Sequence, residues 1–190
     1  MQKQALYSLG CGDRFAREGE AQLAAYIQAR QHGIAVRPVW NKSNREHQTV
    51  HTRPESVRRE ADAAVAALNW RDGYYVDADH ISLANVDGFI EFCDFFTLDV
   101  AENIGAASAP ADLDAFMDAI QPALGEIVLP GLEMKLRLEA PAAREIAGQY
   151  LAAVREAGRI YRHIRERKPG RFAVEISMDE TRAPQTPPEL

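Results

Sequence analysis

The chain has 190 residues, 46% of them hydrophobic, which is enough apolar material for one large packed domain and too much for a disordered chain. Its 28 acidic and 22 basic residues give a net charge of −6, which argues against nucleic acid or an anionic membrane as the main partner. Because it shows no secretory segment or apolar run long enough to span a bilayer, and only two cysteines, Cys11 and Cys93, we expect a cytoplasmic protein with free thiols.

Strand-like and helix-like segments alternate along the chain. Short apolar and β-branched runs predict strands within residues 4–12, 34–40, 73–78, 94–100 and 171–177. Apolar residues at helical spacing predict helices within residues 18–33, 54–69, 111–124 and 142–168, with a short helical turn at 85–93. Residues 106–143 exceed what one crossover connection needs, so we expect an insertion or extra helices there.

This alternation predicts an α/β fold with a parallel sheet, either an open doubly wound sheet or a (β/α)8 barrel of the TIM type. No complete Gly-x-Gly-x-x-Gly fingerprint supports the doubly wound alternative. Each predicted strand ends in a polar cluster, and a barrel collects such clusters on one face, so we prefer the barrel. Five strands do not close a barrel of eight. We therefore expect residues 1–190 to form a partial barrel domain of about five βα units, truncated after residue 190.

The segment YYVDADHISL places three ionisable residues at the end of the third predicted strand. Asp77 and Asp79 share one face if the strand extends that far, and His80 lies at the rim. A neutral imidazole binds divalent metals, and an adjacent carboxylate can move protons near it. The alternative is that these residues only close a loop.

The other strand ends offer candidate contacts to a substrate. In WNKSNREH, a polar loop by prediction, Lys42 and Arg45 could hold a carboxylate, and the asparagines could read hydroxyl groups. A solvated loop is the alternative. On the fifth strand, Glu175 is a candidate metal ligand, proton carrier or hydroxyl acceptor, unless it only forms an ion pair. The predicted substrate-binding residues are Arg14, Asn41, Lys42, Asn44, Arg45, His47, Asp99 and Asp179.

Five segments in order, SLGCGDRF, PVWNKSNREH, YVDADHISL with NVDGFI, DFFTLDVAENIG and EISMDETRAPQTPPEL, together resemble the tagaturonate epimerase family of bacterial hexuronate catabolism. The resemblance extends from about Ser8 to Leu190. It implies a metal-dependent isomerase that interconverts D-tagaturonate and D-fructuronate, with a small sugar acid as its partner. Family members are longer, which implies that further metal ligands lie beyond this chain. Because a half-barrel leaves an edge strand and core surface exposed, we expect the 190 residues alone to be inactive and either poorly soluble or self-associating. A homo-oligomer is compatible with the sequence.

A second, local likeness is to class II metal-dependent sugar aldolases. It implies that Asp79 is the catalytic acid and base, His80 a metal ligand, and Glu175 a catalytic carboxylate near the metal. The cofactor would be a divalent ion such as Zn, Mn or Ni. The carbon to be inverted lies two positions from the ketone, so its hydrogen is not acidic, and retro-aldol cleavage with re-addition is the expected route. An aldolase-like lyase on a related sugar and a non-catalytic barrel subunit remain alternatives.

Overall fold

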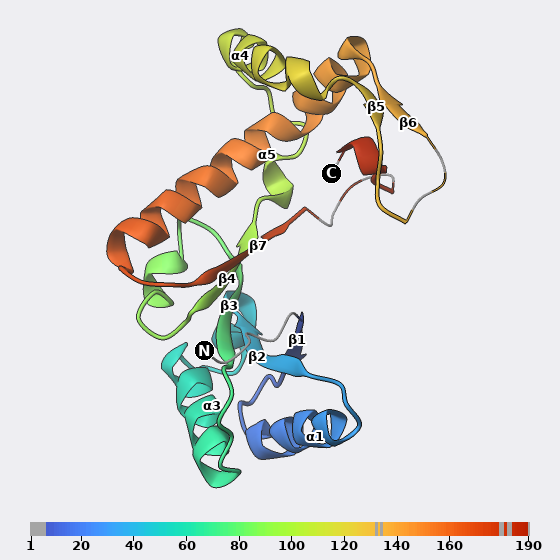
Figure 1. Ribbon diagram of the computed structural model, residues 1–190. Helices are drawn as coiled ribbons and strands as arrows, with labels where there is room; N and C mark the ends of the chain where they lie inside the picture. Colours follow the sequence, from blue (N-terminus) through green and yellow to red (C-terminus); the bar gives the residue numbers. More distant parts are fainter. Residues whose placement is uncertain (1–6, 132, 134, 179–180, 182–183, 190) are drawn as a thin grey trace. The chain divides into compact units, whose positions relative to one another are not determined.

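The computed structural model describes residues 7–131, 133, 135–178, 181 and 184–189 (Figure 1). It divides into two compact units. The first comprises the chain up to Leu98 together with Ile160–Ile176, and the second comprises Asp99–Arg159 with Ser177–Leu190.

A five-stranded sheet organises the first unit. Its strands are β1 (Tyr7–Gly12), β2 (Val36–Ser43), β3 (Tyr75–Ile81), β4 (Phe95–Asp99) and β7 (Ala173–Ser177), adjacent in that order. The first four pair in parallel. Because the order follows the chain without the reversal of a doubly wound sheet, the structure confirms an α/β fold with a partial, barrel-like parallel sheet.

Two helices, α1 (Gly19–Gln31) and α3 (Glu55–Ala67), contact each other and β2. Their apolar residues Leu23, Ala61 and Ala64 are buried, as the helical spacing in the sequence predicts. Residue Gly33 follows α1 with a φ of 82°, a left-handed conformation that favours glycine and ends the helix. Cys11 and Cys93 are both free thiols, as expected.

The segment after β2 differs from its predicted form as a polar loop. Strand β2 continues to Ser43, and a short helix, α2 (Asn44–Thr49), begins at the next residue. The Ser43 side chain accepts a hydrogen bond from the Glu46 amide, while the Glu46 side chain accepts one from the Ser43 amide. This reciprocal capping box satisfies amides at the start of α2 and turns the segment into a helix.

The second unit contains η2 (Ala101–Asn103), α4 (Pro110–Ile120), η3 (Gln121–Ala123), an antiparallel hairpin of β5 (Gly125–Ile127) and β6 (Leu136–Leu138), and η4 (Pro187–Glu189). Helix α5 (Ala140–Arg167) contributes its first twenty residues here and the rest to the first unit. Ion pairs from Arg144 to Asp114 (2.8 Å) and from Arg155 to Asp112 (2.7 Å) connect α5 to α4. Residues 106–143 thus hold a helix and an unforeseen hairpin.

The remaining described element is a short turn, η1 (Val86–Gly88), between β3 and β4. Across the part of the chain that the structure describes, no helix is both long enough and apolar enough to cross a membrane.

Candidate active site

The carboxyl end of β3 is irregular at the residues that the sequence singled out. The pairing of β3 with β4 shifts register between Ala78 and Ile81, so Asp79 and His80 lie in a bulge. The φ of His80 is 51°, a left-handed backbone conformation that costs a non-glycine residue free energy. Bulges re-aim side chains and recur beside active sites, so this distortion favours a functional role for the pair.

The side chains of Asp79 and His80 contact each other directly. The His80 Nδ1 lies 2.7 Å from Asp79 Oδ1, and the imidazole is the more exposed of the two side chains. A carboxylate that accepts from Nδ1–H fixes the ring orientation and presents Nε2 as the ligand atom, as in many metal-binding histidines. The pair can therefore orient a metal ligand or share a proton; which role each residue takes stays a prediction.

Residue Asp77, which has no role assigned from the sequence, is the most deeply buried carboxyl at this site, with 5% of its surface exposed. The Thr97 amide and hydroxyl donate to its two oxygens at 3.2 and 3.0 Å. Burial raises the pKa of Asp77 to about 7, and the nearby charges of Asp79 and Glu175 also raise it, against the opposing effect of the Thr97 hydrogen bonds. Strand β3 thus carries a carboxyl group that is half protonated near neutral pH.

On β2, Asn41 is the register partner of Asp77, so both lie in the same layer of the sheet. The Asn41 Oδ1 atom is buried without a hydrogen-bond partner among the described residues. Gly12 at the end of β1 lies against this oxygen: a Cβ added there would stand 2.9 Å from it, so the Asn41 side chain would have to shift. An unpaired buried acceptor suits a substrate hydroxyl group.

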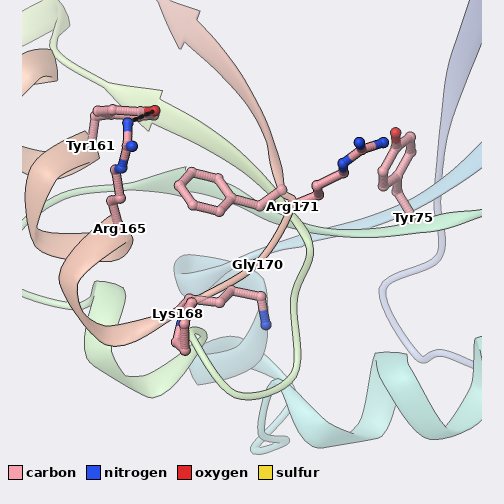
Figure 2. A pocket seen from close by; sticks show the side chains of 8 residues that line it. Tyr75, Tyr161, Arg165, Lys168, Gly170 and Arg171 are labelled. Atoms are coloured by element: carbon pink, nitrogen blue, oxygen red, sulfur yellow. Dashed lines mark hydrogen bonds between the residues drawn. The ribbon is translucent and has the colours of Figure 1, made fainter.

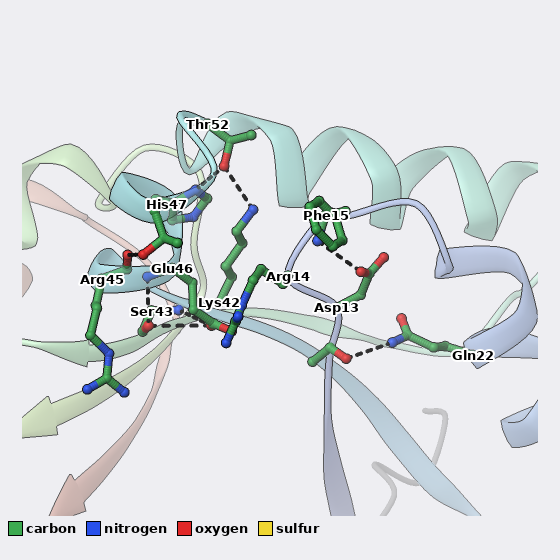
Figure 3. Close-up of polar contacts among 12 residues, drawn as sticks. Asp13, Arg14, Phe15, Gln22, Lys42, Ser43, Arg45, Glu46, His47 and Thr52 are labelled. Atoms are coloured by element: carbon green, nitrogen blue, oxygen red, sulfur yellow. Dashed lines mark hydrogen bonds and ion pairs between the residues drawn. The ribbon is translucent and has the colours of Figure 1, made fainter.

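A chain of polar contacts links Lys42, Thr52 and His47 (Figure 3). The Lys42 Nζ donates to Thr52 Oγ1 at 2.8 Å, and the same oxygen lies 2.9 Å from His47 Nδ1. Lys42 is only 1% exposed, and burial lowers its pKa. Burial and the Lys42 charge lower the pKa of His47 to about 4. His47 is therefore neutral at pH 7, with one ring nitrogen as a donor and the other as an acceptor.

The three candidate cations for a substrate carboxylate, Lys42, Arg45 and Arg14, lie in different surroundings. Figure 3 shows Lys42 directed toward Thr52, while the exposed Arg45 side chain points away from it. Arg14, the third predicted cation, contacts Glu46 at 3.4 Å. Although burial alone would raise the pKa of Glu46, hydrogen bonds from Ser43 and Arg14 hold it below its usual value.

The other predicted residues lie in varied surroundings. Asn44 is the first residue of α2, and Asp99, in the second unit, accepts from the Ala101 amide at 3.2 Å. Glu175 is exposed on β7, not buried as a barrel interior would have it. Asp179 lies outside the described residues. Within the ranges that the structure describes, no cluster of three or more His, Cys, Asp or Glu side chains could hold a metal ion.

One residue that sequence reasoning missed is Thr52, which connects Lys42 to His47. Thr97, one of the polar residues near the end of the fourth predicted strand, holds Asp77. No local pattern identifies these contacts, because each joins residues at least five positions apart. Their roles depend on tertiary packing.

The parallel sheet and the polar groups at its carboxyl ends place the chain among α/β proteins with a partial, barrel-like parallel sheet, a class in which functional sites usually lie where the strands end. Within that class, the family model described as UxaE, tagaturonate epimerase, matches residues 1–189. The chain belongs to the tagaturonate epimerase family, as the sequence motifs predict.

Solved structures of similar fold carry related names. The chain is 22% identical to a glycerol complex of fructuronate-tagaturonate epimerase UxaE from Cohnella laeviribosi, with a TM-score of 0.74. The native structure of that enzyme gives 21% identity and a TM-score of 0.71. Both alignments cover 100% of this chain but 40% of the longer one, so the chain spans well under half of these structures. A comparison with curated protein sequences gives no match.

Proposed function

We propose that this chain belongs to an isomerase that interconverts D-tagaturonate and D-fructuronate, and that its five parallel strands are part of a (β/α)8 barrel. Family membership over residues 1–189 supports the reaction. The observation that carries the site is the Asp79–His80 pair in the distorted end of β3. The sheet order, which follows the chain, supports the barrel.

The reaction inverts a hydroxyl-bearing carbon two positions from a ketone. The hydrogen on that carbon is not acidic, so a base cannot invert it by simple enolisation. Removal of the hydroxyl proton instead allows the carbon–carbon bond to break, and return of the proton follows re-addition to the opposite face of the aldehyde. We assign the proton transfer to Asp79, whose carboxylate is partly exposed and held by His80.

A divalent metal ion, when bound, would polarise the substrate ketone. The His80 imidazole, oriented by Asp79, has the donor chemistry for such an ion, and Glu175 would supply a carboxylate oxygen. Since the described residues form no three-donor cluster, this assignment needs further ligands from outside them.

Substrate contacts would come from the neighbouring strands. The buried, unpaired Asn41 Oδ1 would accept from a sugar hydroxyl. Arg45 is exposed and has no carboxylate partner among the described residues, so it would be better placed than Lys42 to hold the substrate carboxylate.

The test is an Asp79→Asn substitution in the complete protein that contains this chain. Removing a positioned proton carrier is expected to reduce turnover of tagaturonate on the order of 10²- to 10⁴-fold. The metal content, measured by mass spectrometry, should stay close to that of the wild type because His80 is retained. The matched control is Asp118→Asn, an exposed carboxylate on α4, which should keep full activity.

The products decide between the two enzymatic alternatives. Fructuronate formed from tagaturonate identifies an epimerase, whereas net accumulation of three-carbon products identifies a lyase. Wild-type turnover by Asp79→Asn would refute the assignment of the base, and a complete protein without metal and without turnover would indicate a non-catalytic subunit.

A further inference from the structure

A polar pocket lies at the opposite end of the sheet from Asp79 and His80. It has a volume of about 580 Å³ and is lined by three cationic side chains and three aromatic rings (Figure 2): Arg165, Lys168, Arg171, Tyr75, Tyr161 and Phe172. Tyr75 is the first residue of β3, and Phe172 directly precedes β7. The pocket therefore opens at the amino ends of these strands, away from the proposed reaction.

The cations of this pocket have neutral partners. Arg165 donates to the Tyr161 hydroxyl at 3.3 Å, and Lys168 donates to the Ile90 carbonyl at 2.9 Å. Among the described residues, neither these two nor Arg171 forms an ion pair with a carboxylate, and no acidic residue lines the pocket. The chain has more acidic than basic residues, so a pocket that three cationic side chains line without an acidic one is not a consequence of overall composition.

A fourth cation stands beside the pocket. Arg37 on β2 donates to the Tyr75 hydroxyl at 2.6 Å, and its guanidinium lies 4.9 Å from the centre of that ring. Its Nε is buried without a hydrogen-bond partner among the described residues. A buried guanidinium nitrogen with no acceptor is costly. The acid that precedes β4, Asp94, does not supply that acceptor, because it accepts from the Val76 amide at 2.8 Å and pairs with Arg58 at 3.0 Å.

The end of helix α5 explains only part of this charge. Basic residues in a last helical turn offset the negative end of the helix dipole, which accounts for Arg165. Arg37 and Arg171 come from a strand and from the loop before β7, where no helix end requires them. In that loop, Gly170 has a φ of 145°, and a Cβ added there would meet no atom within 4 Å, so its backbone leaves the pocket wall open.

We propose that this pocket binds a small organic phosphate. Several cations around one space suit a dianionic phosphate group, which offers three terminal oxygens, better than a single carboxylate with two. The aromatic rings provide apolar faces for the carbon skeleton of the ligand, and the volume is that of a small-molecule site. The site is independent of the reaction proposed at the carboxyl end of the sheet.

Calorimetric titration of the complete protein with ribose 5-phosphate, inorganic phosphate and ribose tests this site. We expect saturable binding of ribose 5-phosphate that weakens with rising salt, weaker binding of inorganic phosphate, and no binding of ribose. The double variant Arg165→Gln/Arg171→Gln should weaken the binding of ribose 5-phosphate by about tenfold or more. Both arginines are exposed, so the variant should fold, which circular dichroism checks.

The matched control removes two exposed arginines elsewhere, Arg59→Gln/Arg71→Gln, and should keep the wild-type affinity. Binding that the two double variants weaken equally would indicate non-specific charge attraction and overturn the site. Three other results would also overturn the site. They are the absence of saturable binding, binding of ribose as tight as that of ribose 5-phosphate, and binding of an acidic peptide that ribose 5-phosphate does not displace. Asp79→Asn should leave phosphate binding unchanged, which separates a failure here from a failure of the proposed reaction.

Discussion

The two ends of the five-stranded sheet differ in how their charges are paired. At the carboxyl ends, acids pair with bases: Arg14 contacts Glu46, and His80 contacts Asp79. At the amino ends, Arg58 pairs with Asp94 at 3.0 Å, but the cations of the pocket do not pair with an acid. Among the described residues, these cations have only neutral hydrogen-bond partners or none: Arg37, Arg165, Lys168 and Arg171. A net charge of −6 therefore says little about any one site, because the sheet separates its charges by position.

The largest expected effect concerns Asp77, the buried carboxyl on β3 near the carboxyl ends of the strands. Its pKa rises from 3.8 in the unfolded chain to about 7 in the folded one, so the folded state binds the proton more tightly. This contribution to stability is complete below pH 3.8 and is lost as the pH rises through about 7. The loss amounts to about 4 kcal/mol at most.

The variant Asp77→Asn lacks this titration. Relative to the wild type, its free energy of unfolding should therefore increase between pH 5 and pH 8, as measured by urea denaturation. Asp118→Asn on α4 should show no such trend. Parallel pH profiles for wild type and Asp77→Asn would mean that Asp77 is ionised in the folded protein at both pH values.

The second effect concerns Lys42, a buried ammonium whose one direct partner among the described residues is the neutral Thr52. Because burial lowers its pKa, the charge destabilises the folded state at pH 7, and this cost shrinks as the pH approaches 10.5. Lys42→Met should raise the free energy of unfolding at pH 7 by about 1–3 kcal/mol. Turnover should stay near the wild-type value, because Arg45 and not Lys42 is the proposed contact to the substrate carboxylate.

Thermal unfolding and turnover, measured on the same preparations, check this prediction. The matched control is Lys135→Met, which replaces an exposed lysine directly before β6. It should change neither the free energy of unfolding nor turnover appreciably. A Lys42→Met variant that is less stable than the wild type would show that the ammonium supports the fold.

The smallest effect is expected for Arg14, which pairs with Glu46 at the surface. The Arg14 side chain is 57% exposed, so solvent screens the contact. Arg14→Gln should change the free energy of unfolding by less than about 1 kcal/mol, and 0.5 M salt should reduce the difference further. A loss well above that value would assign Arg14 a structural role that its exposure does not suggest.

Local patterns in the sequence predicted most of the fold. The helical spacing of Val57 and Ala61 predicts α3, and the apolar run around Val76 predicts β3. Both predictions work because buried residues set the spacing of apolar side chains along the chain. The helix α2 was missed although its signal, Ser43 followed by Glu46, is local and legible as a capping box. The β5–β6 hairpin was missed because its strands have three residues each, too few to show a period.

The site was predictable in its residue types but not in its contacts. Asp79 and His80 are adjacent in the chain, and strand geometry brings them to the rim. Composition marks Lys42 and Arg45 as candidate cations, but it does not show that Lys42, on β2, is buried against Thr52 while Arg45, within α2, is exposed. The roles of Thr52 and Thr97 depend on contacts between elements, which no single-sequence pattern encodes.

The left-handed backbone of His80 restricts how this position can change during evolution or in a mutant library. With a φ of 51°, residue 80 disfavours β-branched side chains and tolerates asparagine, aspartate and above all glycine. Glycine would relax the backbone and remove the imidazole, so the easiest substitution for the fold is also one that deletes the proposed ligand.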